Sequence, residues 1–428
     1  MKWRMRYLTM FVSALLLVTL SFVLWTSNQK KILRIGVYAG SSWDVPNSRE
    51  NRVLDNIIHQ FEKSHSNVKV VYESGIPKKD YDGWLAEKIL EGEQPDVFMV
   101  PENDFSMLAA SGAFKSLDSL LSKKDVAAYY PVSYQAGLYQ GHSYALPIES
   151  NPVMMCVNKD LLEKEGISIP DSNWTLEDLY AICQKVTKDT NGDGLIDQYG
   201  ITDYTWKQAL VAYNGHLRNQ NGVNIDSVEM HQALSFISKL DSLNQRYKVT
   251  SNDFDEGKVA FYPMSLAQYR TYKPYPYHVA KYSRFSWTCI PMPAAKAGIP
   301  ATQVKTSLFA MSSKTKQDKL AWEFMKLLCQ NQKNQQELFA KSQGTSVLTS
   351  VVKSSQTKKI LQADDFGLDS LTSQRLDHMM KHSVLDISRD LDYHSLERLD
   401  YLLENALKNN EIDSILPSIQ REMEETGK

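Results

Sequence analysis

The sequence predicts an α/β protein built from two lobes, and three observations support this fold class. Strand-like and helix-like segments alternate after residue 31, a pattern typical of a parallel sheet covered by helices. A second group of strand-like segments begins near residue 144. The 428 residues leave nearly 400 after an apolar N-terminal segment, which is too many for one hydrophobic core and suits two.

The first lobe begins with alternating strands and helices. Residues 32–38 alternate in the β-branched manner of a strand, and residues 49–65 carry apolar side chains at helical spacing. Residues 94–96 (QPD) end a helix and lead into a short apolar strand. The predicted elements are, in order, strand 32–38, helix 49–65, strand 68–72, helix 81–91, strand 97–100, and a helix from Asp104 to about Gly112.

The second lobe has more widely spaced strands. A helix follows Thr175, whose hydroxyl can cap it together with Asp178. From about residue 361 onward the sequence is charged and helical, without a strand signal. The predicted elements are strands at 144–148, 152–157, 258–262, 286–290 and 307–311, and an amphipathic helix at 317–329.

The N-terminal segment, residues 1–31, is interpreted as a membrane anchor or a signal. Residues 8–25 are uncharged and mostly apolar, with basic residues on both sides, and this length is near the lower limit for a spanning helix. A cleaved secretory signal is the alternative, but residues 23–27 (VLWTS) lack the small residues that a cleavage site needs. In either case we expect the rest of the chain outside the cell, at the face of the membrane or secreted.

Composition excludes some classes of partner. The formal net charge is −2 with 23% charged residues, which argues against nucleic-acid binding because that requires a basic surface. The 22 Tyr and 8 Trp include enough aromatic side chains to offer rigid contact surface for a ligand. The four cysteines have no metal-like spacing and lie in apolar stretches, so we interpret them as buried side chains. An outside location would allow two of them to pair, and the sequence does not say which.

Several segments, taken in order, resemble the extracellular solute-binding proteins of sugar-importing ABC transporters, the family that includes maltose-binding protein. The resemblance covers roughly residues 32–344. The segments are 94–97 (QPDV), 104–105 (DF), 110–114 (ASGAF), 144–147 (YALP), 158–161 (NKDL), 174–179 (WTLEDL), 254–261 (FDEGKVAF) and 319–328 (KLAWEFMKLL).

The resemblance implies a two-lobe periplasmic-binding-protein-like fold whose discontinuous lobes close on a ligand by hinge motion. It places the N-lobe at residues 32–147 and 305–347, and the C-lobe at 148–304 and 348–428. Chain crossings are expected near 147–150, 301–306 and 345–355. The chain departs from the family's Gram-positive pattern because no lipid-accepting Cys follows the apolar segment, and the helical tail after residue 361 has no counterpart.

The candidate ligand-binding residues combine aromatic rings, which stack on sugars, with planar polar side chains, which bond hydroxyls. Trp43 and Asp44 lie in the loop after the first strand. The resemblance implies that Asn103, Asp104, Glu149, Asn151, Trp206, Tyr213, Tyr269 and Arg270 also face the cleft. Simpler interpretations stay open: Asp104 can act only as a helix cap, and Trp206 can be structural.

Residues 189–197 (DTNGDGLID) match the first part of an EF-hand calcium loop. The predicted ligands are Asp189, Asn191, Asp193, the carbonyl of Leu195, and Asp197. Gly200 stands where an EF-hand has its bidentate Glu, so a solvated turn is the alternative. Any calcium ion here would be structural.

The sequence thus predicts a solute-binding protein that captures a sugar or oligosaccharide and delivers it to ABC permease subunits. Two alternatives stay open: a ligand-sensing accessory protein of a membrane histidine kinase, and a glycan-acting enzyme. The enzyme is disfavoured because none of the motifs GxSxG, HExxH, P-loop or GxGxxG occurs at a strand–helix junction. No cofactor is required for binding.

Overall fold

The computed structural model describes residues 30–43, 45, 50–101, 103–245, 247–272, 285–364, 371–409 and 411–426. Within these residues, no helix has the length and apolar character needed to cross a membrane. The predicted membrane segment at residues 8–25 lies outside the described part of the chain, and so does the candidate ligand contact Asp44.

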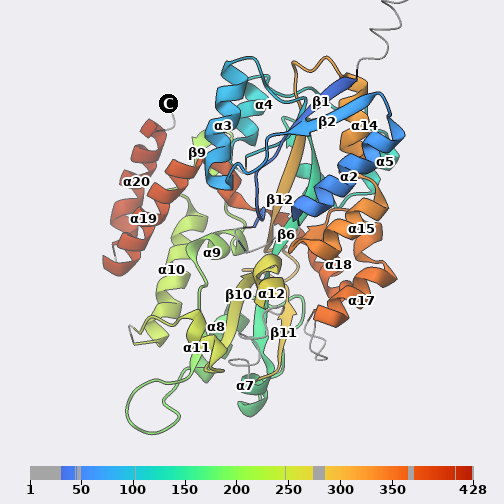
Figure 1. Ribbon diagram of the computed structural model, residues 1–428. Coiled ribbons are helices and arrows are strands. Elements are labelled where there is room, and N and C mark those ends of the chain that lie inside the picture. Colours follow the sequence, from blue (N-terminus) through green and yellow to red (C-terminus); the bar gives the residue numbers. More distant parts are fainter. Residues whose placement is uncertain are drawn as a thin grey trace, which may run out of the picture.

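The chain forms two α/β lobes joined by long strands that run from one lobe to the other (Figure 1). The N-lobe contains β1 (Lys31–Gly36), α2 (Glu50–Ser64), β2 (Val68–Tyr72), α3 (Lys78–Leu90), β3 (Val97–Met99), α4 (Phe105–Ala110), α5 (Lys123–Ala127), α6 (Pro131–Gln135), α14 (Asp318–Cys329) and α15 (Gln332–Lys341). The C-lobe contains α7 (Lys159–Lys164), α8 (Leu176–Val186), β7 (Tyr199–Ile201), α9 (Trp206–Ala212), α10 (Val228–Leu243), α11 (Ser251–Asp255), β10 (Val259–Ser265), α12 (Leu266–Tyr272) and β11 (Trp287–Ile290). Two short hairpins, β4 (Leu138–Tyr139) with β5 (His142–Ser143) and β8 (Arg218–Asn219) with β9 (Gly222–Val223), lie outside the main sheet.

The predicted parallel sheet of the first lobe is confirmed. β1 pairs in parallel with β2 and β3, and the strand order continues through β12 (Thr302–Met311) to β6 (Ala145–Asn158), β10 and β7. β12 lies between β3 and β6 and is antiparallel to both, so Ala310 is opposite Phe98 on one side and Ala145 on the other. Of β1, β2 and β3, only β3 is apolar and buried throughout, whereas β1 and β2 contain both buried and exposed residues.

β6 crosses between the lobes as one continuous strand, where the sequence predicted two shorter strands. β6 has 14 residues, and its Ser150 pairs with Thr306 of β12 and with Thr345 of β13 (Thr345–Ser346). The crossings expected near 147–150 and 301–306 are therefore parts of β6 and β12. Pro147 and Pro152 suggested a break, but a backbone partner on each side keeps the segment extended, with a register shift between Ser307 and Leu308.

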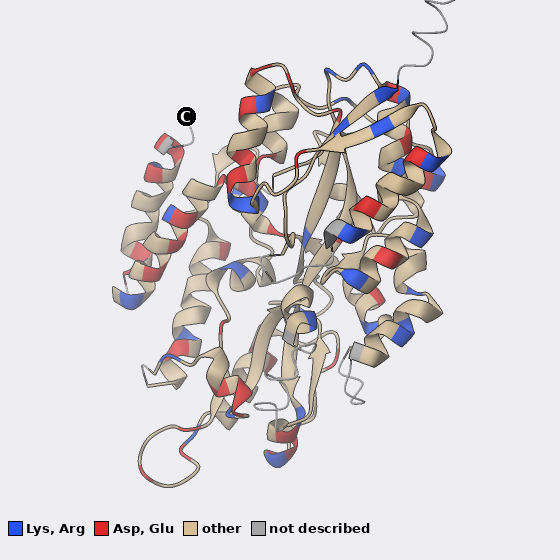
Figure 2. Ribbon diagram, in the orientation of Figure 1, with Lys and Arg blue, Asp and Glu red and all other residues tan. Residues whose placement is uncertain are grey.

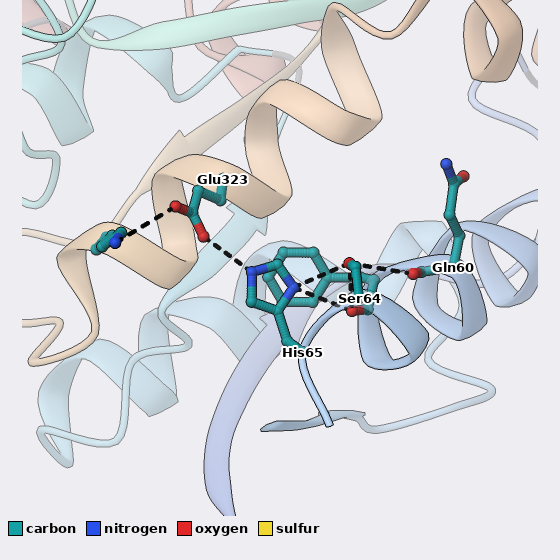
Figure 3. A network of polar contacts seen from close by, with 6 residues as sticks. Gln60, Ser64, His65 and Glu323 are labelled. Carbon is teal, nitrogen blue, oxygen red and sulfur yellow. Dashed lines mark hydrogen bonds and ion pairs between the residues drawn. The ribbon is translucent and has the colours of Figure 1, made fainter. Parts of the chain in front are cut away.

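A polar network joins α2 to α14 on the N-lobe (Figure 3). His65 follows α2, stacks on Phe61 with ring centroids 4.2 Å apart, and places its Nε2 3.0 Å from Glu323 Oε2 of α14. The hydroxyl of Ser64 lies 3.0 Å from Nδ1 of the same ring. This histidine therefore holds two helices together.

The helices after residue 348 form two groups. The first group, α16 (Thr349–Val352), α17 (Ser355–Asp364) and α18 (Ser373–Lys381), packs against α15 and α6. The second group, α19 (Tyr393–Asn409) and α20 (Ile412–Thr426), forms a hairpin on α10, as Figure 1 shows. The predicted division of the chain into 32–147 with 305–347, and 148–304 with 348–428, stays a prediction.

One expectation for this tail is wrong. Between the two groups, β14 (Ser383–Leu385) pairs in parallel with residues 302–304 of β12, and a 3-10 helix (Ile387–Asp390) leads into α19. The edge of β12 supplies backbone partners that the local sequence does not reveal. Charge is mixed on this tail and on both lobes, where Lys and Arg alternate with Asp and Glu on the outer helices (Figure 2).

Candidate functional site

A cavity of about 490 Å³ opens where the loops after β1 and β3 meet β12 and the first residue of α19. The carboxyl ends of β-strands in open α/β sheets are where such proteins bind ligands. The volume lies within the range of about 300–1,000 Å³ for small-molecule sites. Polar and aromatic side chains line the cavity, among them Trp43, Asp82, Asn103, Asp104, Lys305 and Tyr393.

Three of the predicted ligand-binding residues meet in this cavity: Trp43, Asn103 and Asp104. Trp43 is held by the turn of residues 41–43, in which its backbone N–H donates to Ser41 Oγ (3.1 Å). Asn103 and Asp104 follow β3, whose three residues are buried between β1 and β12. A rigid sheet edge therefore presents one ring, one amide and one carboxyl to the same space.

Two buried polar atoms near the cavity have no hydrogen-bond partner among the described residues: Trp43 Nε1 and Asn103 Oδ1. The indole of Trp43 lies close enough to Glu149 to favour its charged form, although the geometry does not make a hydrogen bond. A buried polar atom without a partner costs roughly 1–3 kcal/mol. A ligand hydroxyl bonded to Asn103 Oδ1 would remove part of that cost.

Asp104 occupies the N-cap position of α4, but its side chain makes no capping hydrogen bond. Its pKa is raised, first by burial and then by the negative charges of Asp82 and Asp392. The interpretation of Asp104 as only a helix cap is therefore wrong for its side chain. The carboxyl groups of Asp82 in α3 and of Asp392, just before α19, thus lie near enough to Asp104 to disfavour its charged form.

Glu149, Asn151 and Arg270 are buried at the crossing between the lobes, with exposures of 3%, 5% and 6%. Glu149 Oε1 accepts hydrogen bonds from Ser342 Oγ and from Gly344 N–H (2.8 Å), and Arg270 Nη1 donates to Gly344 O (2.9 Å). Burial raises the pKa of Glu149, although these bonds, the indole of Trp43 and the charge of Arg270 favour the carboxylate.

Asn151 and Gly344 complete this crossing. Asn151 Oδ1 accepts from Ala267 N–H (3.0 Å) at the start of α12. Gly344 has no room for a side chain, because a Cβ there would lie 2.5 Å from Glu149 Oε1. Their polar groups are bonded within the protein and hold the segments that connect the lobes.

The remaining predicted residues lie in the C-lobe. Trp206 is 3% exposed, and its Nε1 donates to Asp400 Oδ1 of α19 (2.8 Å). Tyr269 is 1% exposed and packs on Trp287, with ring centroids 5.5 Å apart. Tyr213 is half-buried at the end of α9, and its pKa is raised by burial and then by Glu177. The structure does not bring these three to the cavity wall.

Sequence reasoning missed several residues of the cavity, including Lys79, Asp82, Thr306 and Tyr393. Asp82 and Lys79 come from the first turns of α3, a helix that was predicted but not assigned to the site. Tyr393 comes from the tail that had no counterpart in the resemblance, so no signal in the sequence pointed to it.

The predicted calcium loop, residues 189–197, is exposed, and its side chains bond within the loop. Asp189 accepts from the N–H groups of Gly192 and Gly194 (both 2.7 Å), which lower its pKa, and Asp197 accepts from the Thr190 N–H (2.8 Å). Across the described residues, no group of three or more His, Cys, Asp or Glu side chains is arranged to hold a metal ion. The calcium site stays a prediction.

A family model described as bacterial extracellular solute-binding protein matches residues 56–364 of this chain. That region includes most of the N-lobe, the crossing and the C-lobe strands. The chain belongs to this family. The predicted resemblance is thereby confirmed, and an extracellular location follows from the family.

Curated relatives match parts of the chain. A maltotriose-binding protein of Pyrococcus abyssi is 23% identical over 138 residues, which are 32% of this chain and 30% of the relative. A binding protein of Brucella abortus is 25% identical over 261 residues, or 58% of this chain and 61% of the relative. The chain therefore spans less than two thirds of the length of these relatives.

Solved structures show the same two-lobe fold. The sugar-binding protein MalE of Xanthomonas citri has a TM-score of 0.74 at 16% identity, over 92% of this chain and 97% of the other. An ABC substrate-binding protein of Listeria monocytogenes, in complex with cycloalternan, has a TM-score of 0.64 at 19% identity, over 93% and 99%. The predicted two-lobe α/β fold of the binding-protein type is confirmed.

Proposed function

We propose that this solute-binding protein captures a sugar or oligosaccharide in the cavity at the ends of β1 and β3 and delivers it to the permease of an ABC importer. The observation that carries the proposal is the meeting of the Trp43 ring with the unpartnered Asn103 Oδ1 and the half-buried carboxyl of Asp104. An aromatic ring offers a surface for the CH face of a sugar, and the polar atoms accept from its hydroxyls. The family and the sugar ligands named for its relatives support the same ligand class.

The residues that line the cavity also support a mechanism in which the lobes close on the ligand and the closed form is recognised by a permease. N-lobe residues line most of it, whereas Tyr393 comes from α19, whose Asp400 accepts a hydrogen bond from Trp206 of the C-lobe. A ligand that contacts both sides binds the closed arrangement better and shifts the equilibrium towards it. Residues 8–25, as a retained anchor, would keep this closed form beside the permease at the outer face of the membrane.

The two alternatives, an accessory protein of a sensor kinase and a glycan-acting enzyme, have no specific observation in their favour. The relatives are named as binding proteins and as components of ABC transporters. Binding and release of an unchanged sugar would support delivery, and hydrolysis of a glycan by the purified protein would support the enzyme.

Thermal unfolding of residues 30–428 against mono-, oligo- and uronic-acid-containing sugars tests the proposal. A ligand at a hundred times its Kd adds about 2.7 kcal/mol to the stability of the folded state. We expect one class of sugar to raise the unfolding temperature, without formation of a product. If no sugar does so, the cavity takes another kind of solute.

Calcium at residues 189–197 is proposed only as a structural ion. The test is the same unfolding measurement with calcium or a chelator, on the natural chain and on Asp189→Ala. A rise in unfolding temperature with calcium that is absent in the variant would support the site. The same unfolding temperature of the natural chain with calcium and with chelator would leave the loop as a solvated turn.

A further inference from the structure

Cys156 and Cys289 lie directly opposite each other on neighbouring strands. Cys156 belongs to β6 and Cys289 to β11, and the antiparallel register pairs these two residues. Their Sγ atoms are 3.6 Å apart, and both side chains are fully buried. The structure therefore answers a question that the sequence left open, which two of the four cysteines can meet.

The geometry of this pair suits a disulfide. Opposite residues of antiparallel strands have Cα atoms about 4.5–5.5 Å apart, and disulfides span Cα separations of about 4.4–6.8 Å. Directly paired residues also project to the same face of a sheet, so the two sulfur atoms already face each other. The other two cysteines are placed differently: Cys183 belongs to α8 in the C-lobe core, and Cys329 to α14 in the core of the N-lobe.

The compartment also suits a disulfide. Proteins outside the cytoplasm meet oxidising conditions, in which cysteine pairs with suitable geometry become oxidised. We propose that Cys156 and Cys289 form a disulfide in the exported protein. This inference rests on the extracellular location of the family and not on the identity of the ligand.

The chemistry is thiol–disulfide exchange with a protein or small-molecule disulfide as oxidant. One cysteine thiolate attacks the oxidant, forms a mixed disulfide and releases one thiolate. The second cysteine thiolate then attacks the first cysteine's sulfur and expels the other thiolate. The two cysteines lose two electrons, the oxidant disulfide gains them, and its two thiolates take up the two protons.

Burial determines when this exchange takes place. Neither sulfur is accessible once β6 and β11 have paired, because both side chains have an exposure of 0%. The attack requires an accessible thiolate, so it takes place before the sheet closes. Oxidation should therefore be fast during refolding and slow on the folded protein.

The bond would join the two ends of the lobe crossing. β6 carries the chain from the N-lobe into the C-lobe, and β11 precedes the segment that returns through β12. The two cysteines are 133 positions apart, so the link would close a long loop in the unfolded chain. Closing a long loop lowers the entropy of the unfolded state and stabilises the folded protein.

The experiment counts thiols in the exported full chain. The protein is purified without reductant, unfolded in urea with excess iodoacetamide, and analysed by intact mass and peptide mapping. We expect two modified cysteines, Cys183 and Cys329, and one disulfide-linked peptide pair that contains Cys156 and Cys289. Four modified cysteines, or a linked pair with any other partner, would overturn the proposal.

Cysteine variants test which residues form the disulfide. In Cys183→Ala the linked pair should persist, and in Cys156→Ala or Cys289→Ala it should be lost. A reductant should lower the unfolding temperature of the natural chain by about 5 °C or more and leave that of Cys289→Ala unchanged. Equal sensitivity of both proteins to reductant would contradict the proposed link. The thiol count on the natural chain decides the matter if a variant fails to fold.

Discussion

Polar side chains occur both at the crossing between the lobes and at the cavity beside it, but their hydrogen bonding differs. At the crossing, Glu149 accepts two hydrogen bonds from within the protein, and Arg270 donates to a backbone carbonyl. At the cavity, Asn103 Oδ1 has no partner among the described residues, and Asp104 makes no capping bond. Polar groups that the protein itself bonds fix the architecture, whereas groups left without a partner are available to a ligand.

The largest effect is expected from Glu149→Ala. The substitution leaves the Ser342 hydroxyl, the Gly344 N–H and the Arg270 charge without their buried carboxylate. We expect a loss of about 3 kcal/mol or more in the free energy of unfolding, measured by urea denaturation.

The matched control for that variant is Glu163→Ala, at an exposed position of α7, which should stay within about 0.5 kcal/mol of the natural chain. If Glu149→Ala instead keeps its stability and loses sugar affinity, Glu149 binds the ligand and does not serve mainly to hold the crossing together.

Two glycine substitutions should have opposite signs. Gly344→Ala places a methyl group against the Glu149 carboxylate and should destabilise by about 1–3 kcal/mol. Gly83→Ala, inside α3 with nothing within 4 Å of the new methyl group, should stabilise by up to about 1 kcal/mol. Urea denaturation of both variants measures the difference. A neutral Gly344→Ala would mean that the crossing is more loosely packed than the structure indicates.

Substitutions at Trp43 test the cavity. Trp43→Ala should weaken sugar binding by about 10- to 100-fold, because the stacking surface is lost, with little change in stability. Trp43→Phe keeps an aromatic ring and should retain most of the affinity. Isothermal titration of both variants checks this.

The control is Trp84→Ala in α3, because Trp84 does not line the cavity and its indole N–H donates to Glu73 (3.0 Å). It should leave affinity unchanged. Equal losses at Trp43 and Trp84 would argue against the cavity as the ligand site.

The smallest effect concerns a third kind of polar contact, at the surface. His231 of α10 lies 2.9 Å from both Asp226 and Asp413, and Asp413 belongs to α20. Burial lowers the pKa of His231, but the two carboxylates outweigh it and raise the pKa above the ordinary 6.5. The folded state therefore holds the proton more tightly than the unfolded state.

It follows that His231 contributes stability that is fully present below pH 6.5 and is lost as the pH rises through the raised folded-state pKa. Urea denaturation as a function of pH should show this decrease in the natural chain, and a smaller one in His231→Asn. Identical pH profiles would rule out His231 as the cause.

The parts predicted correctly from sequence are those whose signals are local. β1, β2 and β3 alternate along the chain with α2 and α3, so this alternation is readable from the sequence. Trp43, Asn103 and Asp104 lie in the segments after β1 and β3, and their contact with a ligand stays a prediction. The resemblance implies that Glu149 and Arg270 face the cleft, but their observed partners, Ser342 and Gly344, come from a distant segment. Residue type alone does not say whether a buried carboxylate will be satisfied internally.

Other features depend on long-range pairing. The continuous β6 exists because β12 and β13 supply backbone partners across Pro147 and Pro152. Tyr393 reaches the cavity only because β14 pairs with the edge of β12 and directs the chain back between the lobes. Neither pairing has a periodic signal in the sequence.

The position of β12 has a consequence for the order of folding. This strand, residues 302–311, fills the space between β3 and β6, so the N-lobe sheet stays incomplete until most of the chain has been made. Contacts between residues so far apart form slowly. β1, β2 and β3 consequently lack this neighbour until residues 302–311 are available, so the N-lobe sheet cannot be completed before the C-lobe elements up to β11 have been made.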